Sequence, residues 1–307
     1  MTKLRVSVVE YLNTAPLVWG FTDGGLGGGY ELDFTLPSLC AEALRSGRAD
    51  IGIIPAIEYQ RMEDVVAFDG MAIAAKREVR SILIVARRPI ERVRTMALDT
   101  SSRSSTAMVK VLGRRRWNIE PEYIDAAPNP QAMLERADAA LVIGDPALRL
   151  AVKIDALHAK KPVAGGACCL GDADELPVPG VSILFVYDVV AEWRAWTGLP
   201  AVLALWAARR EVATPKVVED FLASKAYGLE HVNDIARQAA DELDIPEPAI
   251  ETYLRENVNF DLDAANLAGL ERYYQECADA SLIARVRPLE LVRATSAAAG
   301  ERQGTKR

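Results

Sequence analysis

The sequence predicts an α/β protein of about two domains, with a helical block at its C-terminal end. Over the first two-thirds of the chain, short apolar runs typical of β-strands alternate with helical patterns, which favours mostly parallel sheets crossed by helices. The 307 residues correspond to about two domains at roughly 150 residues each. From residue 215 onward only the apolar periodicity of helices remains.

The strands are predicted where apolar side chains follow one another without helical spacing. These runs lie at 4–9, 30–36, 50–54, 81–86, 94–98, 139–143, 181–186 and 202–208. Helical patterns lie between several of them, at 39–47, 56–62, 104–116 and 188–198. Further helices are predicted within 217–243, 247–258 and 264–283, and the last residues are expected to fray.

Five of the predicted strands run directly into a signal for the start of a helix. The signals are capping side chains or a proline in the first turn: Asn13 and Thr14 before Pro16, Ser38, Pro55, the hydroxyl-rich stretch 100–106, and Asp145 before Pro146. Ligands of α/β proteins bind in the crevice at the carboxyl ends of strands. Helix N-termini there offer unpaired N–H groups and a positive dipole end, so we expect an anion site at this edge.

The densest signal is the segment 100–106, Thr-Ser-Ser-Arg-Ser-Ser-Thr, in which Arg103 is the single residue without a hydroxyl. A carboxylate at this loop could accept hydrogen bonds from hydroxyls and from backbone N–H groups. The simpler interpretation is a capping loop with redundant hydroxyls. Residues 76–116 around it hold twelve basic and three acidic side chains, which suits a small anion, although solvated surface charge explains the same count.

Composition and missing motifs argue against several classes of function. The 36 basic and 43 acidic residues give a net charge of −7, which argues against a nucleic-acid binder. No apolar run reaches membrane-spanning length and the N-terminus does not read as a signal peptide, so we expect a cytoplasmic protein that does not bind membranes. Four cysteines, two of them adjacent, and two histidines argue against a metal site, and no nucleotide-binding or hydrolase motif is present.

Six segments together resemble the chorismate dehydratases, which open the futalosine route to menaquinone. They are VVEYLNTAPLVWGF, SGRADIGIIPAIEYQRM, RSILIVARRPI, ALDTSSRSSTAMVKVL, ADAALVIGDPAL and EWRAWTGLPAVLALWAARRE, in this order between about residues 5 and 285. The resemblance implies a two-lobed type II periplasmic-binding-protein-like fold, whose α/β lobes close on a ligand like a flytrap. It places lobe one at 1–88 and 204–290, lobe two at 89–203 and a tail at 291–307, with 81–86 and 202–208 as crossing strands.

The family reaction removes water from chorismate and yields 3-[(1-carboxyvinyl)oxy]benzoate. Because the ring becomes aromatic in this step, the resemblance implies no redox cofactor and no metal. It implies Asn13 and Ser81 as catalytic residues, with the Asn13 amide donating to the leaving hydroxyl. The residues implied in binding the dicarboxylate substrate are Thr14, Ser101, Ser102, Arg103, Ser104, Ser105, Gly144 and Asp145.

Two acidic residues keep two interpretations each. Asp145 is either a substrate contact or only a helix cap, because its charge would lie beside a dianion. Glu58, in the segment IPAIEY, is either a base or the partner in a salt bridge near the hinge.

The same fold leaves two other functions open. The sister enzyme of the pathway, 1,4-dihydroxy-6-naphthoate synthase, shares fold and size, although YLNT and WTGLP favour the dehydratase. A solute-binding protein of this fold would bind a small carboxylate without catalysis, but such receptors carry an export signal. The expected partner is chorismate, with neither nucleic acid nor membrane, and the sequence allows a homodimer.

Overall fold

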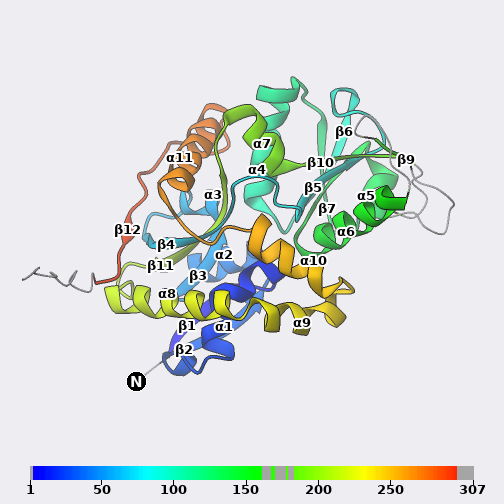
Figure 1. The fold of residues 1–307 in the computed structure, drawn as a ribbon. Coiled ribbons are helices and arrows are strands. Elements are labelled where there is room, and N and C mark those ends of the chain that lie inside the picture. The colour runs from blue at the N-terminus through cyan, green and yellow to red at the C-terminus, as the bar shows by residue number, and fades with distance from the viewer. Residues whose placement is uncertain (1–2, 161–166, 170–177, 179–182, 296–307) are drawn as a thin grey trace, which may run out of the picture.

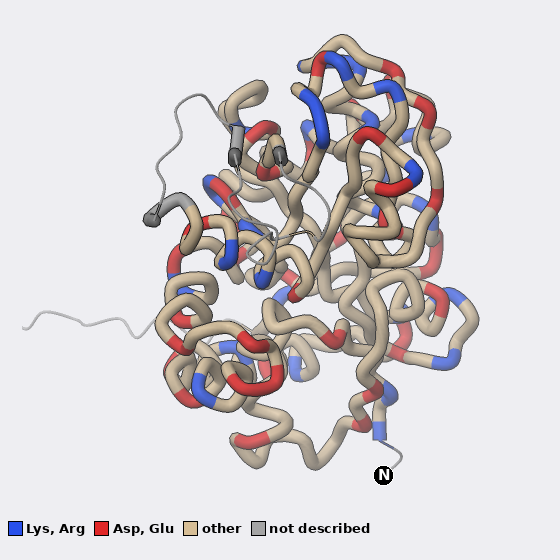
Figure 2. The backbone as a smooth tube through the Cα atoms, turned by 90° about the vertical axis from the view of Figure 1, so that its right-hand side faces the viewer, with Lys and Arg blue, Asp and Glu red and all other residues tan. Residues whose placement is uncertain are grey.

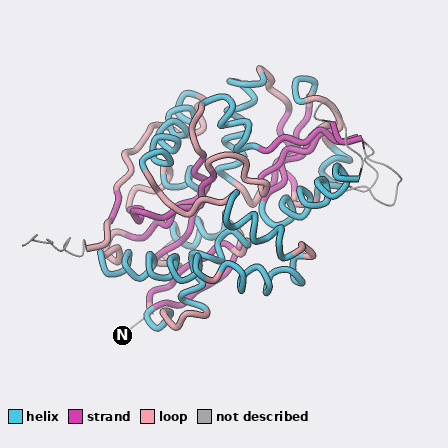
Figure 3. The backbone as a smooth tube through the Cα atoms, in the orientation of Figure 1, coloured by secondary structure: helices cyan, strands magenta, loops and turns pink. Residues whose placement is uncertain are grey.

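The structure, a computed structural model, describes residues 3–160, 167–169, 178 and 183–295. Within these residues the chain forms two β-sheets with their own helices, which lie side by side as two lobes (Figure 1, Figure 3). The predicted α/β fold and the helical C-terminal block are confirmed. No helix in the described part of the chain is both long and apolar enough to cross a membrane.

Lobe one is built on a six-stranded sheet with the order β12-β4-β11-β3-β1-β2. Its strands are β1 (Leu4–Val9), β2 (Tyr30–Thr35), β3 (Ile51–Pro55), β4 (Val65–Ala75), β11 (Ala201–Arg209) and β12 (Leu291–Val292). Strands β1, β2 and β3 are parallel, with Val6 opposite both Leu32 and Ile51, because the chain returns through a helix each time. Strand β11 runs antiparallel between β3 and β4, so the strand that returns from lobe two lies inside this sheet.

Lobe two is built on a second six-stranded sheet with the order β7-β6-β8-β5-β10-β9. Its strands are β5 (Ile82–Ala86), β6 (Thr95–Asp99), β7 (Glu122–Ala126), β8 (Ala139–Ile143), β9 (Ala167–Cys169) and β10 (Ile183–Asp188). Strand β6 is parallel to β7 and β8, whereas β5 and β10 are antiparallel to their neighbours. The sheets are therefore mixed, and the prediction of mostly parallel sheets is wrong. The first strand after each crossing, β5 in lobe two and β11 in lobe one, runs antiparallel to both of its neighbours.

Helices accompany both sheets. Lobe one carries α1 (Ala15–Thr22), α2 (Pro37–Arg45) and α3 (Ala56–Tyr59), together with the C-terminal block of α8 (Pro215–Glu230), α9 (Val232–Leu243), α10 (Glu247–Thr252) and α11 (Ala264–Asp279). Lobe two carries α4 (Arg103–Leu112), α5 (Pro130–Arg136), α6 (Gly144–Lys160) and α7 (Val189–Thr197). Short 3-10 turns lie at Leu12–Thr14 (η1), Gly27–Gly29 (η2) and Ile90–Arg92 (η3), and π-turns at Gly113–Trp117 (η4) and Tyr253–Asn257 (η6).

The C-terminal block supports the first helix of lobe one. Helix α8 crosses α1 so closely that a Cβ on Gly228 would lie 2.0 Å from the carbonyl oxygen of Pro16. A Cβ on Gly20 would lie 2.5 Å from the Cα of Ser224. Because Pro16 stands in the first turn of α1, this packing holds in place the segment just before it, which contains Asn13.

The chain crosses between the lobes at 76–81 and at 198–200. The sequence assigns the first crossing to 81–86 and ends the first segment of lobe one at 88, but β5 pairs with β8 and β10 in the second sheet. The last strand before the crossing is instead β4, which was not predicted. It contains Asp69 and Gly70 and bulges there against β11, with Gly70 at φ +78°. The polar bulge interrupts the apolar run, so β4 lacks the continuous pattern of a buried strand.

Three edge strands, β7, β9 and β12, do not correspond to any predicted strand, and β9 has only three residues. Strand β7 is half-buried and polar, and β12 is only two residues long. Strand β12 pairs in parallel with β4, Leu291 lying opposite Ala67, so the prediction that 291–307 is only a tail is wrong at its start. The remainder of that predicted tail, from residue 296, lies outside the described residues.

The basic side chains of 76–116 are distributed among ion pairs with acidic residues from many parts of the fold. Representative N···O distances are 3.0 Å for Arg115 with Glu276 and 2.9 Å for Arg88 with Asp138. The paired residues are Lys76, Arg80, Arg88, Arg103, Arg114, Arg115 and Arg116. Basic and acidic positions alternate over the backbone in Figure 2. The positive charge of this segment is therefore largely compensated by its surroundings and is not a field directed at one ligand.

Candidate functional site

A small cavity lies between the lobes, at the ends of strands from both sheets. Its volume is about 60 Å³, well below the usual size of a ligand pocket. Hydrogen bonds join the two lobes around it, between Leu12 and Asp145 and between Ile57 and Ser104, and we refer to this arrangement as the closed form. The lining residues are Val9, Tyr11, Asn13, Pro37, Pro55, Ile73, Ser81, Ile82, Ser102, Ser104, Ser105, Ile143, Gly144, Leu203 and Ala204. The predicted site residues that reach this cavity are therefore Asn13, Ser81, Ser102, Ser104, Ser105 and Gly144.

Asn13 reaches the cavity from turn η1, which connects β1 to α1. Its neighbour Thr14 is buried and does not line the cavity. The Thr14 hydroxyl donates to Asn13 Oδ1 at 3.4 Å. The Asn13 amide nitrogen carries two N–H donors; the hydrogen bond with the Tyr253 hydroxyl uses one of them, which leaves the second for a ligand. Thr14 is thus placed to orient Asn13, and its predicted contact with a ligand stays a prediction.

Ser81 lies at the end of the first crossing, where two other residues hold it. The hydroxyl of Tyr253, from turn η6, donates to Ser81 Oγ at 2.8 Å. Burial raises the pKa of Tyr253 far above its usual value, only partly offset by hydrogen bonds with Ser81 and Asn13, so the phenol stays protonated. Asp188 accepts hydrogen bonds from the N–H groups of Val79 at 3.0 Å and Arg80 at 2.6 Å, and so fixes the backbone before Ser81.

Sequence reasoning missed Tyr253 and Asp188. Tyr253 stands in a periodic apolar stretch of the C-terminal block, where an aromatic residue is indistinguishable from core. Asp188 also caps α7 through the N–H groups of Val190 and Ala191, both at 3.0 Å, and a capping pattern gives no sign of its second set of partners. Both residues come close to Ser81 only through the tertiary fold.

The serines of the segment 100–106 have different roles: one caps a helix, and three line the cavity. Ser102 is the N-cap of α4 and accepts a hydrogen bond from Ser105 N–H at 3.3 Å, so the capping interpretation is confirmed for this residue. Ser104 Oγ accepts from the N–H of Ile57 in lobe one at 3.2 Å. Among the described residues, Ser105 Oγ makes no hydrogen bond to a protein group, although this side chain lines the cavity.

Ser101 does not line the cavity. Its N–H and its hydroxyl both donate to Asp99 Oδ1, at 2.8 Å and 2.6 Å. The Ser101 oxygen also lies 3.4 Å from the hydroxyl of Tyr11, which does reach the cavity. Asp99 ends β6 and binds the hydroxyl of Ser101, two residues further along, so in this structure the Ser101 hydroxyl is engaged with Asp99.

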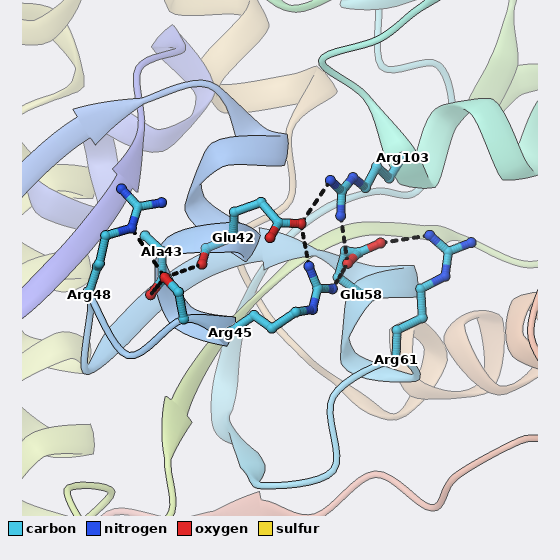
Figure 4. Close-up of polar contacts among 8 residues, drawn as sticks. Glu42, Ala43, Arg45, Arg48, Glu58, Arg61 and Arg103 are labelled. Atoms are coloured by element: carbon cyan, nitrogen blue, oxygen red, sulfur yellow. Dashed lines mark hydrogen bonds and ion pairs between the residues drawn. The ribbon is translucent and has the colours of Figure 1, made fainter.

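Arg103 also points away from the cavity, toward lobe one (Figure 4). Its guanidinium lies 2.9 Å from Glu58 Oε2 and 3.1 Å from Glu42 Oε1. Glu58 is fully buried and also pairs with Arg45 and with Arg61, the latter at 2.7 Å. Burial raises the pKa of Glu58, but hydrogen bonds from Arg45 and Arg61 and the charge of Arg103 outweigh it and lower the pKa overall. The salt-bridge interpretation of Glu58 is confirmed.

Gly144 and Asp145 are the first two residues of α6 in lobe two, the lobe that also carries α4. Gly144 has φ +66°, and a Cβ at this position would lie 2.6 Å from the Tyr11 ring. The Asp145 carboxylate accepts from the N–H of Leu12 in lobe one at 3.1 Å. Asp145 therefore connects the lobes and does not line the small cavity, and as the second residue of α6 it is not the predicted N-cap.

The buried carboxyl of Asp145 makes stability depend on pH. Burial raises its pKa to about 6, partly offset by the hydrogen bond from Leu12 N–H. Between pH of about 4 and 6 the folded form keeps a proton that the unfolded chain releases, so the free energy of unfolding falls as pH rises. Relative to Asp145→Asn, the parent protein should lose on the order of 2 kcal/mol between pH 4 and 7. Denaturant unfolding at both pH values measures this, and a difference that does not change with pH would contradict it.

The amino-acid sequence matches a protein family and an individual relative over most of its length. The profile of a family described as menaquinone biosynthesis matches residues 4–279. A chorismate dehydratase from Thermus thermophilus is 24% identical over 250 residues, which is 80% of this chain and 86% of that protein.

Solved structures share the fold at low sequence identity. A protein from Archaeoglobus fulgidus has a TM-score of 0.67 at 16% identity, over 92% of this chain and 98% of that one. The alkanesulfonate-binding protein SsuA from Xanthomonas axonopodis pv. citri, bound to MOPS, has a TM-score of 0.63 at 14% identity, over 96% and 99% of the two chains. The periplasmic-binding-protein-like fold is thereby confirmed.

Proposed function

The chain belongs to the menaquinone biosynthesis family, and we propose that it dehydrates chorismate to 3-[(1-carboxyvinyl)oxy]benzoate. The observation that carries the proposal is the composition of the interlobe cavity. Asn13 and Ser81 face the start of α4, where Ser102, Ser104 and Ser105 are gathered. A related protein of similar length carries the name chorismate dehydratase. The proposed enzyme is a carbon–oxygen lyase of the futalosine pathway that works in the cytoplasm.

The start of α4 suits one carboxylate of a dianionic substrate. The N-terminus of this ten-residue helix presents backbone N–H groups and the positive end of its dipole. Ser105 adds a hydroxyl whose donor is free of protein partners within the described residues. A substrate carboxylate at this helix start would accept charge-assisted hydrogen bonds from these N–H groups and from the Ser105 hydroxyl, so no basic side chain is required to bind it.

The reaction removes a ring proton and the neighbouring hydroxyl, which leave together as water. Among the described residues that line the cavity, none carries a carboxylate or an imidazole. The nearest candidates are engaged elsewhere, Asp145 with Leu12 N–H and Glu58 with three arginines. The substrate itself has a carboxylate on its enolpyruvyl arm, tethered near the proton that leaves, and a tethered base gains from proximity. We infer that this carboxylate takes the proton.

The protein then supplies orientation and a donor for the departing hydroxyl. Asn13 offers its amide N–H, and Ser81, which accepts from Tyr253, keeps its own proton for the ligand. Closing the lobes around the ring removes water and strengthens these hydrogen bonds. The ring electrons complete an aromatic system, so the reaction as written passes no electrons to an acceptor.

Incubation with chorismate tests the proposal. Ultraviolet absorbance and mass spectrometry should detect an aromatic product lighter than chorismate by one water, formed in proportion to protein concentration. Heated protein and a protein-free sample correct for spontaneous breakdown of chorismate. Binding without turnover would favour the solute-binding alternative, and absence of both would overturn the proposal. If the protein does not turn over chorismate but turns over the substrate of 1,4-dihydroxy-6-naphthoate synthase, it is that sister enzyme.

The proposal predicts that Ser105→Ala weakens chorismate binding. A hydrogen bond to a charged group contributes roughly 1.5–3 kcal/mol, which corresponds to about a ten- to hundredfold loss of affinity. Thr106→Ala is the matched control, because Thr106 is the next hydroxyl on the same helix and does not line the cavity. Isothermal titration calorimetry measures both variants. Equal affinities in well-folded Ser105→Ala and the parent protein would remove Ser105 from the site.

A further inference from the structure

We propose that Arg103 is an interlobe positioning residue, whose ion pair with buried Glu58 holds the cleft closed. Arg103 is the first residue of α4 in lobe two, and Glu58 belongs to α3 in lobe one. Figure 4 shows the Arg103 guanidinium directed across the lobe boundary toward Glu42 and Glu58. The effect on turnover described below rests on the proposed function, whereas the effect on shape does not.

The start of α4 contacts lobe one through Arg103 and through Ser104, whose carbonyl oxygen also accepts from the Tyr273 hydroxyl of α11 at 2.9 Å. Arg103 Nη1 lies 2.9 Å from Glu58 Oε2. At the next residue of α4, the Ser104 hydroxyl accepts from the N–H of Ile57, the residue before Glu58, at 3.2 Å. Because Arg103 stands between Ser102 and Ser104, both of which line the cavity, the ion pair fixes the serines relative to Asn13 on the other side.

The charges around Glu58 allow this contact to break and form again. In lobe one, Glu42 and Glu58 are balanced by Arg45 and Arg61, which remain in place when the lobes separate. Glu58 is fully buried, and a buried carboxylate left without partners would be strongly destabilising. Since two arginines of its own lobe stay bound, loss of Arg103 does not create that situation. Arg103 is therefore the removable member of the cluster.

Two arginines of this cluster, Arg45 and Arg103, differ in the lobe that carries them. Arg45 pairs with the same two carboxylates as Arg103, but it lies on α2 in lobe one and connects nothing across the cleft. A variant of Arg45 therefore changes the same ion-pair cluster without changing an interlobe contact. The two arginines form a matched pair in which only the lobe differs.

Loss of the interlobe contact should reduce the population of the closed form. Apparent affinity falls by the same factor as the population of the binding-competent state. Arg103→Gln should therefore raise KM for chorismate about tenfold, while kcat at saturation changes less than twofold, because Arg103 touches no reacting atom. Arg103→Lys should recover part of this loss, since an ammonium retains the charge but not the two-pronged contact.

The experiment compares Arg103→Gln, Arg103→Lys and Arg45→Gln with the parent protein. Small-angle X-ray scattering of each ligand-free protein measures its radius of gyration, and chorismate titration and turnover give Kd, KM and kcat. We expect a larger radius of gyration and higher KM in Arg103→Gln, an intermediate result in Arg103→Lys, and values close to the parent in Arg45→Gln. Circular dichroism verifies that each variant is folded.

Two outcomes would overturn the proposal. An unchanged radius of gyration in Arg103→Gln with weaker chorismate binding would make Arg103 a direct ligand contact. Equal effects of Arg103→Gln and Arg45→Gln on shape and KM would show a general role of the cluster in stability. If the parent protein does not turn over chorismate, the proposed function fails, but the scattering comparison still decides whether Arg103 holds the lobes together.

Discussion

Replacing Asn13 with alanine should lower kcat for chorismate by about a hundredfold or more, the scale of losing one transition-state donor. The Asn13 side chain lines the cavity. Its amide nitrogen carries two N–H donors, and the hydrogen bond with the Tyr253 hydroxyl uses one, which leaves the other for the departing hydroxyl. Alanine removes this donor and adds no charge. Single-turnover rates measured with saturating chorismate isolate the chemical step from binding.

Asp145→Asn is the comparison for this variant. It keeps an acceptor for Leu12 N–H and should retain most of the turnover, because Asp145 does not line the cavity. Near-complete loss of turnover in Asp145→Asn, with chorismate still bound, would identify a protein base and refute proton removal by the substrate's own carboxylate. Parent-like kcat in a folded Asn13→Ala variant would remove Asn13 from the reaction.

Gly144→Ala should abolish most activity by preventing the lobes from closing. The added Cβ would lie 2.6 Å from the Tyr11 ring, closer than carbon atoms approach, and the ring belongs to the other lobe. The position also has φ +66°, which disfavours any side chain. We expect kcat/KM to fall by about a hundredfold, equivalent to roughly 2.7 kcal/mol of lost transition-state stabilisation.

Gly25→Ala separates the steric effect from the backbone effect. Gly25 lies between α1 and η2, away from both crossings, and has φ +72°, but a Cβ there meets no atom within 4 Å. It should lose stability like Gly144→Ala and retain near-parent kcat/KM. Removing the clashing ring in the double variant Tyr11→Ala/Gly144→Ala should restore part of chorismate binding. If Gly25→Ala loses as much activity as Gly144→Ala, closure against Tyr11 is not the cause.

The sequence pattern predicts an element well where burial is continuous. Strand β3 is buried at every position and was predicted to within one residue at each end. Strand β4 is longer and equally central, yet it was missed because Asp69 and Gly70 form a bulge in its middle. The first lobe boundary predicted from the sequence differs from the structure for the same reason, because the sequence pattern assigns to β5 the place that β4 occupies.

The candidate site was predicted in part. Asn13, Ser81 and three serines of 100–106 reach the cavity, because strand ends of an α/β fold meet at one edge. Arg103 was grouped with these serines by adjacency alone. Successive residues of a helix point in directions about 100° apart, so Ser102 and Ser105 share a face that Arg103 leaves. The partner of Arg103 is Glu58 of the other lobe. A local sequence pattern cannot predict this pair, because it depends on how the two lobes contact each other.

The position of β11 in the first sheet determines the order in which the protein can fold during synthesis. Strand β11 pairs with both β3 and β4, but it leaves the ribosome more than a hundred residues after β4 ends. Until then β3 and β4 present unpaired edges, which are prone to aggregation. Lobe two is formed by one continuous stretch and can fold in the interval. A nascent chain halted before residue 201 should therefore contain a folded inserted lobe beside an incomplete one, and should depend on chaperones to remain soluble.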